Sequence, residues 1–421
     1  MCLCFPALWK CNSFKRRKIA QQILGHAIAL AVASGSMAAD IMRLNRVGLL
    51  LDLDLDRGID TKAEAALILA QLDGVFDVER MPEWWARYQY LRGLHAACCD
   101  DAQAMWDVAE HILDQSGGLV KRANSLADMR VYLGLLSQAC DYGVLGAIRA
   151  SGVAEGLRLT RRLYGRLFEA GDGSIIKAEH VAEIYLVNPS VDDWCGIFLV
   201  LGDECNFYEL PGLGSDMWAD AIHNDQPGFF AGTQALGQGS GVAQFKDHLV
   251  YWIEQMSGRL GPISADLLEL GVEEIVLFAM GGWCTVPFAG LQMPDERVLI
   301  ERIRIANGPD AYHPRSEPIR RIVHICDERL EQADAEIALL GDFGVEVERE
   351  TTLDSIHAIL GGSKRHDLIH FTCHGSHDFE FSDGGGVICP DGEILTARWV
   401  FEHARLEGRP LISLASCQSG L

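Results

Sequence analysis

Two apolar segments near the C-terminal end of the chain each finish in a residue that can take part in nucleophilic catalysis. Segment 368–373 is followed by His374 and Gly375, and segment 411–416 is followed by Cys417. A cysteine nucleophile needs a nearby imidazole that takes the thiol proton, and the resulting ion pair lowers the thiol pKa below its free value of about 8.5. If the two segments are neighbouring strands, this pattern predicts a catalytic dyad of His374 and Cys417.

Glycines follow both candidate residues within three positions, as Gly375 and Gly420. A backbone amide without a bulky side chain beside it can approach the oxyanion that develops during acyl transfer. We therefore expect the amides of Gly375 and Cys417 to form an oxyanion hole.

Other polar residues beside the candidate dyad have simpler explanations. His370 and His374 are four residues apart, which on a strand separates them by about 13 Å and excludes a shared metal ion. His370 is therefore interpreted as a core or supporting histidine. Strand alternation puts Cys373 on the face opposite His374, as buried filler, and His377 is expected in an exposed loop.

The elements that must position the candidate dyad alternate between strand and helix, which predicts a parallel, right-handed α/β sheet. In open parallel sheets, reactive groups gather just beyond the carboxyl ends of the strands. Strands are predicted at 321–326, 345–350, 367–374 and 411–416, helices at 330–340, 353–360 and 397–406, and a hairpin at 385–396.

The rest of the chain divides into a helical part and a first strand-containing part. Residues 19–180 carry apolar residues three and four apart, which is typical of helices. Irregular helical hairpins are expected there; tetratricopeptide-like repeats are the other form considered, but the 34-residue pattern matches few positions. Further predictions are strands at 184–187, 196–201 and 274–279, a hairpin reaching 206–208, a loop over 211–241 and a helix at 243–256.

The segments 369–375 and 414–420 resemble the histidine and cysteine boxes of the CHAT domain, a branch of the caspase and separase group of cysteine peptidases. Three upstream segments follow the order of the same family: 286–291, 307–311 and 391–397. The resemblance covers about residues 181–421 and implies a caspase-like parallel sheet with flanking helices. CHAT domains commonly follow helical repeats, which agrees with an all-α region at 41–180.

The resemblance implies hydrolysis of a peptide bond in a protein partner. His374 would be the general base, Cys417 the nucleophile, and the amides of Gly375 and Cys417 the oxyanion hole. No metal and no organic cofactor is implied, and a protein regulator is expected to bind the helical region. The alternative is a non-catalytic interaction scaffold with a degenerate or incomplete peptidase domain, because the chain ends at Leu421 whereas the family continues through a further helix and strand.

Metacaspases, another branch of the group, carry an acidic residue two positions before the cysteine, where this chain has Ala415. Their preference for basic residues therefore does not carry over. Three carboxylates in the loop after His374 remain as a possible pocket for Arg or Lys, although a solvated loop is the expected interpretation; they are Asp378, Glu380 and Asp383.

Composition excludes several other classes of function. The chain has 36 basic and 59 acidic residues, a net charge of -23, so neither nucleic acid nor a membrane surface is an expected partner. No glycine-rich phosphate loop indicates a nucleotide site. The 13 cysteines follow no repeating spacing, which favours reduced thiols and a cytoplasmic protein.

The segment 1–40 has two interpretations. A basic cluster at 15–18 and an uncharged stretch at 19–39 resemble an export signal. An alanine-rich helix, or a start of translation at Met37 or Met42, is the simpler alternative.

Overall fold

The computed structural model divides the chain into two compact units. Unit 1 comprises Met1–Val120 and Tyr132–Tyr312, and unit 2 comprises Lys121–Val131 and His313–Leu421. The structure describes residues 14–33, 38–57, 60–116, 126–167, 179–189, 194–210, 242–279, 288–295, 297–308, 318–327, 330, 333–342, 345–376, 386–406 and 410–415.

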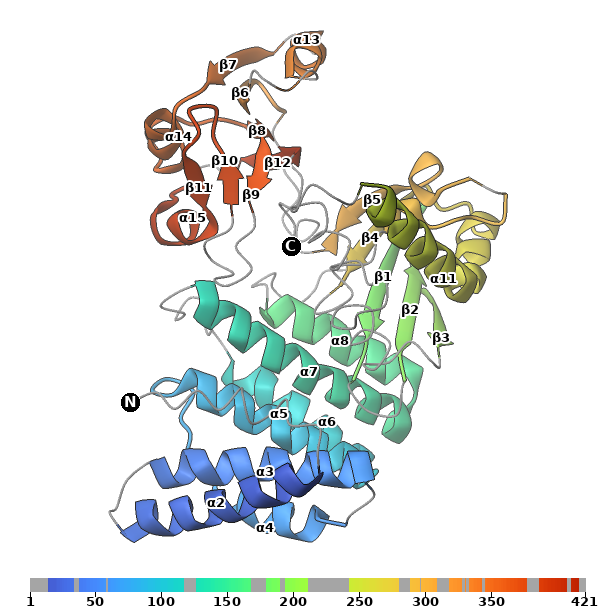
Figure 1. Cartoon of the computed structure of the whole chain (residues 1–421). Helices are drawn as coiled ribbons and strands as arrows, with labels where there is room; N and C mark the ends of the chain where they lie inside the picture. The colour runs from blue at the N-terminus through green and yellow to red at the C-terminus, as the bar shows by residue number, and fades with distance from the viewer. Residues whose placement is uncertain are drawn as a thin grey trace. The chain divides into compact units, whose positions relative to one another are not determined.

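Unit 1 begins with a stack of helices in which neighbours in sequence pack against each other (Figure 1). The helix α3 contacts α2, α4 and α5, and α5 also contacts α6. The helices are α2 (Phe14–Ala33), α3 (Ala38–Arg57), α4 (Lys62–Gln71), α5 (Pro82–Cys98), α6 (Ala102–Gln115), α7 (Leu126–Ser151, in unit 1 from Tyr132) and α8 (Val153–Leu167). This confirms the predicted all-α region that precedes an α/β fold.

The helix α6 shows why these segments are helical. Asp101 caps its first turn by accepting a hydrogen bond of 3.0 Å from the Ala104 amide. Its buried residues recur three and four apart, so one apolar stripe faces the core; they are Met105, Val108, Ala109, Ile112 and Leu113.

A mixed five-stranded sheet follows in unit 1, in the order β3-β2-β1-β4-β5. The pairs β1–β2 and β2–β3 are antiparallel, whereas β1–β4 and β4–β5 are parallel. The strands are β1 (Val181–Val187), β2 (Gly196–Leu201), β3 (Glu204–Glu209), β4 (Glu274–Phe278) and β5 (Arg304–Asn307). The predicted hairpin after 196–201 is thus confirmed.

Both faces of β1 are buried, with a different layer on each side. Ile184 and its alternate neighbours pack against α11 (Val242–Glu269). Glu183 and Tyr185 point the other way, where Arg161 of α8 binds Glu183 at 2.8 Å. Since side chains alternate along a strand, the sheet in unit 1 lies between α8 and α11.

The helix α11 extends to Glu269, well beyond the predicted end near 256. This helix contains Pro262, which removes one helical hydrogen bond. Leu260, Ile263 and Leu267 are buried against the sheet, and this packing holds the helix through the proline.

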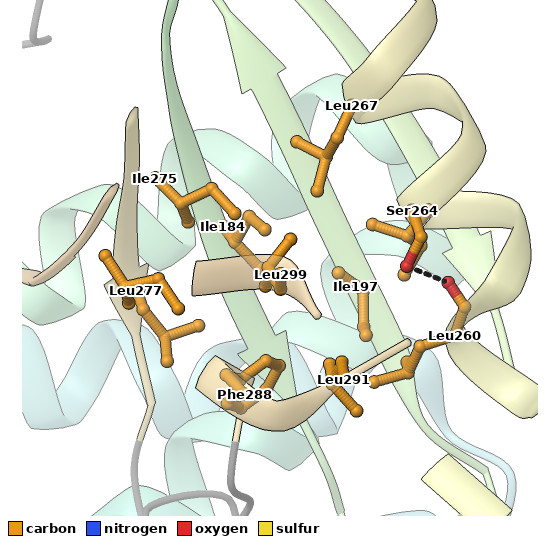
Figure 2. Close-up of a pocket in the computed structure, with 12 residues that line it drawn as sticks. Ile184, Ile197, Leu260, Ser264, Leu267, Ile275, Leu277, Phe288, Leu291 and Leu299 are labelled. Atoms are coloured by element: carbon orange, nitrogen blue, oxygen red, sulfur yellow. Dashed lines mark hydrogen bonds between the residues drawn. The ribbon is translucent and has the colours of Figure 1, made fainter. Parts of the chain in front are cut away.

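A small cavity lies between α11 and the sheet, lined almost entirely by aliphatic side chains (Figure 2). The one polar side chain in its wall, Ser264, donates its hydroxyl to the carbonyl of Leu260 on the same helix. The volume of about 20 Å³ suits at most one water molecule. The cavity is a gap in core packing and offers no polar group to a substrate.

Unit 2 contains a four-stranded sheet in the order β12-β8-β6-β7 in which every pair is parallel. Its elements are β6 (Arg321–Cys326), α13 (Ala333–Asp342), β7 (Glu346–Glu350), α14 (Leu353–Leu360), β8 (Leu368–Thr372), α15 (Ala397–His403) and β12 (Leu411–Ala415). The predicted parallel α/β sheet with flanking helices is therefore confirmed for this unit.

The segment predicted as one strand over 367–374 is divided in the structure. It ends its parallel pairing at Thr372, and β9 (His374–Ser376) then pairs antiparallel with β10 (Gly386–Ile388). The strand β11 (Ile394–Thr396) completes a three-stranded sheet with the order β11-β10-β9. Because His374 pairs with Ile388 of this second sheet, the parallel strand ends at Thr372, two residues before its predicted end.

Candidate functional site

The two strands that lead to the candidate dyad are direct neighbours. The strands β8 and β12 run parallel, with Leu368 opposite Leu411 and Thr372 opposite Ala415. The carboxyl ends of β8 and β12 therefore meet at one edge of the sheet. The arrangement of strands that a dyad requires is present.

His374 lies two residues after Thr372, on β9, opposite Ile388 of β10. Its side chain is exposed, and Gly375, opposite Val387, is half-buried. The His374 imidazole, at the start of β9, is therefore accessible from solvent.

Several predicted site residues lie outside the residues that the structure describes. The last described residue of the chain is Ala415, so the position of Cys417 stays a prediction, as does that of Gly420. The same holds for the loop after Ser376, with His377, Asp378, Glu380 and Asp383.

The neighbouring cysteine, Cys373, faces the core. Its thiol is buried and donates to the carbonyl of Ile325 at 3.4 Å. Burial raises the pKa of Cys373 to about 12. Phe371, two residues earlier, packs in the same cluster against Ile356 of α14. The interpretation of Cys373 as buried filler is confirmed.

The opposite face of the unit 2 sheet carries a polar cluster that the sequence analysis did not find. We call His324, His370 and Glu336 the His–His–Glu cluster. Nε2 of His370 lies 3.0 Å from Oε2 of Glu336, and Nε2 of His324 lies 3.9 Å from the same oxygen. The Thr372 hydroxyl donates to Glu336 and lies 2.8 Å from Nε2 of His324.

The register of the sheet explains how two of these residues meet. His324 of β6 is the direct partner of His370 on β8, and their stacked rings have centroids 5.1 Å apart. Glu336 reaches them from α13, which covers this face. A signal was present in the sequence, since both strands have a histidine between apolar residues, within 322–326 and 368–371.

Burial and neighbouring charges set the protonation of this cluster. Burial, with a further contribution from His370, lowers the pKa of His324 to about 4. Burial acts to raise the pKa of Glu336, but hydrogen bonds from Thr372 and His370 outweigh it, so that the pKa is lowered overall. At neutral pH the cluster therefore combines a neutral His324 ring with a carboxylate.

Comparison with known protein families was informative for the C-terminal part of the chain. Residues 251–421 match the family model described as the CHAT domain. The C-terminal part of the chain is thus similar to the CHAT domain. The match includes His374, Gly375 and Cys417, and it confirms the family predicted from the histidine and cysteine boxes. No curated protein matches the chain significantly.

The CHAT match begins inside α11 and continues through the end of unit 1 into unit 2. The CHAT domain relates the chain to the caspase-like peptidases. An extension of the domain back to residue 181 stays a prediction, as does the boundary at 180 between the helical region and the CHAT domain.

The N-terminal segment forms the helix α2 from Phe14 to Ala33, packed against α3. Leu24 is buried, whereas Ile23 and Leu30 are exposed. Among the described residues, none of the helices combines the length and the apolar character needed to cross a membrane. Export of the chain stays a prediction.

Proposed function

We propose that the chain is a caspase-like cysteine endopeptidase that cleaves a protein partner. The observation that carries the proposal is the parallel pairing of β8 with β12, in which Thr372 is opposite Ala415. Two residues beyond this last pair in sequence are His374, at the start of β9, and Cys417. The two reactive groups then share one edge of the sheet.

In the proposed reaction, the His374 imidazole accepts the proton of the Cys417 thiol, and the thiolate attacks the carbonyl carbon of the scissile peptide bond. The amides of Gly375 and Cys417 stabilise the oxyanion of the tetrahedral intermediate. The intermediate collapses to a thioester as the imidazolium returns its proton to the leaving amine. Water, deprotonated by His374, then hydrolyses the thioester and restores the thiol.

Burial of the other cysteines in the described part of unit 2 supports the choice of Cys417 as nucleophile. Cys326, Cys373 and Cys389 are all buried. Burial raises the pKa of Cys373 to about 12 and that of Cys389 to about 11. Such thiols are not ionised at neutral pH and do not act as nucleophiles.

A protein regulator bound by the helical stack is the second element of the proposal. The helices α2 and α4 expose large apolar side chains, among them Leu30, 74% exposed, and Leu67, 61% exposed. Apolar side chains on the outside of a helical stack are suited to a protein partner. The regulator would act on cleavage by binding this surface.

The proposal is tested by labelling new protein N-termini after incubating the full chain with a cell extract. We expect new termini with the wild-type chain, and none with Cys417→Ala or His374→Ala. The matched control is Cys99→Ala, which removes an exposed cysteine of the helical region and should leave cleavage unchanged.

The non-catalytic scaffold makes the opposite prediction for the same variants. Equal sets of new termini from the wild-type chain and from Cys417→Ala, with partner capture retained by both, would reject the peptidase in favour of the scaffold. Loss of both cleavage and capture in Cys99→Ala would show that the effects come from misfolding rather than from chemistry.

A further inference from the structure

The His–His–Glu cluster has the ligand types and the spacing of a metal site. His324, His370 and Glu336 each offer one ligand atom, and these three atoms all lie within 4.8 Å of one another. Ligand atoms bound to Zn²⁺ at about 2.0–2.2 Å in a tetrahedral site are roughly 3.3 Å apart. The two separations from Glu336 Oε2, 3.0 and 3.9 Å, lie on either side of that value.

Three different elements hold these ligands, and two of them are paired strands of one sheet. The direct pairing of His324 with His370 across β6 and β8 sets the imidazoles side by side independently of any side-chain contact. Glu336 is on α13 and remains 29% exposed, while the His370 side chain is 14% exposed and that of His324 fully buried. The cluster is thus preorganised, and an ion can reach it from the Glu336 side.

The hydrogen bonds within the cluster leave His324 incompletely satisfied. Because the Thr372 hydroxyl gives its proton to Glu336, Nε2 of His324 must be the donor in its contact of 2.8 Å with Thr372 Oγ1. Nδ1 of His324 is buried and has no hydrogen-bond partner within the described part of the chain. Moving the ring proton from Nε2 to Nδ1 therefore breaks no hydrogen bond at Nδ1, and it frees Nε2 as a ligand.

The charges around the cluster also suit a cation. Glu336 supplies a carboxylate beside the fully buried His324 ring. Arg349, the β7 partner of His324, directs its Nε–H to Cys326 Sγ at 3.1 Å and has Asp334 within 3.8 Å. Its positive charge is thereby partly balanced outside the cluster.

We propose that His324, His370 and Glu336 bind a divalent transition-metal ion, with Zn²⁺ the best match. Two imidazoles and one carboxylate form a ligand set that Zn²⁺ accepts, with a fourth position left to water or to the Thr372 hydroxyl. Such an ion would tie α13 to β6 and β8. The proposal departs from the expectation of a metal-free protein, and it does not depend on peptidase activity.

A second histidine–glutamate pair in unit 2 provides a matched control. His366 is also buried, its Nδ1 also has no partner among the described residues, and its Nε2 lies 3.3 Å from Glu348. Glu348 is 34% exposed, close to the 29% of Glu336. This pair differs from the cluster in having one imidazole rather than two, and Lys364 already binds its carboxylate.

The test measures Zn²⁺ binding to the full chain by isothermal titration and by metal analysis after dialysis, with a phosphine reductant present. We expect the wild-type chain to bind one more equivalent of tightly held Zn²⁺ than Glu336→Gln or His370→Asn. The affinity at this site should fall by more than the roughly 10–100-fold typical of losing an outer-shell group. Glu348→Gln should retain the equivalent, and zinc bound by other cysteines and histidines is common to all variants.

Equal stoichiometry and affinity in the wild-type chain and Glu336→Gln would overturn the proposal, and so would an equal loss in Glu348→Gln. In either case the cluster is a hydrogen-bonded network without a metal. If His370→Asn does not fold, as judged by circular dichroism, the comparison of Glu336→Gln with Glu348→Gln decides the question. A Co²⁺ absorption spectrum typical of four ligands in the wild-type chain, absent in Glu336→Gln, would give independent support.

Discussion

Replacing Arg161 by methionine should destabilise unit 1 far more than the same change at the adjacent Arg162. Both arginines are on α8 and both bind a glutamate, but the surroundings differ. The pair Arg161–Glu183 is 15% and 4% exposed, whereas Arg162–Glu110 is 37% and 34% exposed. The comparison isolates the effect of burial on an ion pair.

The magnitude follows from what each variant leaves behind. In Arg161→Met, Glu183 loses guanidinium contacts at 2.8 and 3.3 Å and remains as a buried carboxylate hydrogen-bonded by the Tyr185 hydroxyl at 2.7 Å. Breaking a buried pair from one side costs about 3–5 kcal/mol. In Arg162→Met, an exposed pair is lost, which costs about 1 kcal/mol even with its two hydrogen bonds.

Urea unfolding followed by tryptophan fluorescence measures the difference in stability between the two variants. The signal reports mainly on unit 1, because Trp399 is the one tryptophan of the nine that lies in unit 2. Adding Glu183→Gln to Arg161→Met should recover part of the lost stability, since no unpaired charge is then buried. Equal losses for Arg161→Met and Arg162→Met, or no recovery in the double variant, would refute this reasoning.

Three further predictions concern other buried features. Iodoacetamide at neutral pH should leave Cys373 and Cys389 unmodified in the folded chain, because burial raises the pKa of these thiols to about 12 and about 11. Mass spectrometry of the digested protein checks this prediction, and rapid modification of either cysteine would contradict it. Gly143→Ala on α7 should cost about 1–3 kcal/mol of stability, because a Cβ there would lie 2.2 Å from the Cβ of Ala109. A Cβ at Gly134 on the same helix meets nothing within 4 Å, so Gly134→Ala should stabilise the protein by up to about 1 kcal/mol. Thermal unfolding should show stability changes of opposite sign for the two variants, and changes of the same sign would contradict the packing. Burial raises the pKa of Asp141 to about 8, although a hydrogen bond from the Asn188 backbone acts to lower it. The folded chain therefore holds a proton that the unfolded chain releases near pH 4, and stability should fall as pH rises from about 4 to about 8. Asp141→Asn should lose this pH dependence of stability, and an unchanged slope would contradict the prediction.

Much of the fold could be predicted because local pattern and tertiary contacts agree. The strands 196–201 and 321–326 and the helix 353–360 have the predicted ends. In each, an apolar run or stripe is bounded by a turn or a capping residue, such as Thr352 before α14. That β8 and β12 are neighbours was only a condition of the predicted dyad, and the structure supplies it through their parallel pairing.

The features that escaped prediction depend on pairing between distant segments. The segment 367–374 was predicted as one strand. Only the antiparallel pairing of His374 with Ile388 shows that a second sheet begins at His374. The His–His–Glu cluster was missed for the same reason. His324 and His370 are 46 residues apart, and they meet through the register of β6 and β8. No spacing rule for metal ligands spans such a distance.

The central claim, that the His374 imidazole activates the Cys417 thiol, is tested most directly by the pH dependence of Cys417 alkylation. The rate at this one residue, followed by mass spectrometry, reports the fraction of thiolate. An ion pair with His374 predicts an apparent thiol pKa clearly below about 8.5 in the wild-type chain, and a return to about 8.5 in His374→Ala. The same pH profile in both proteins would contradict the account.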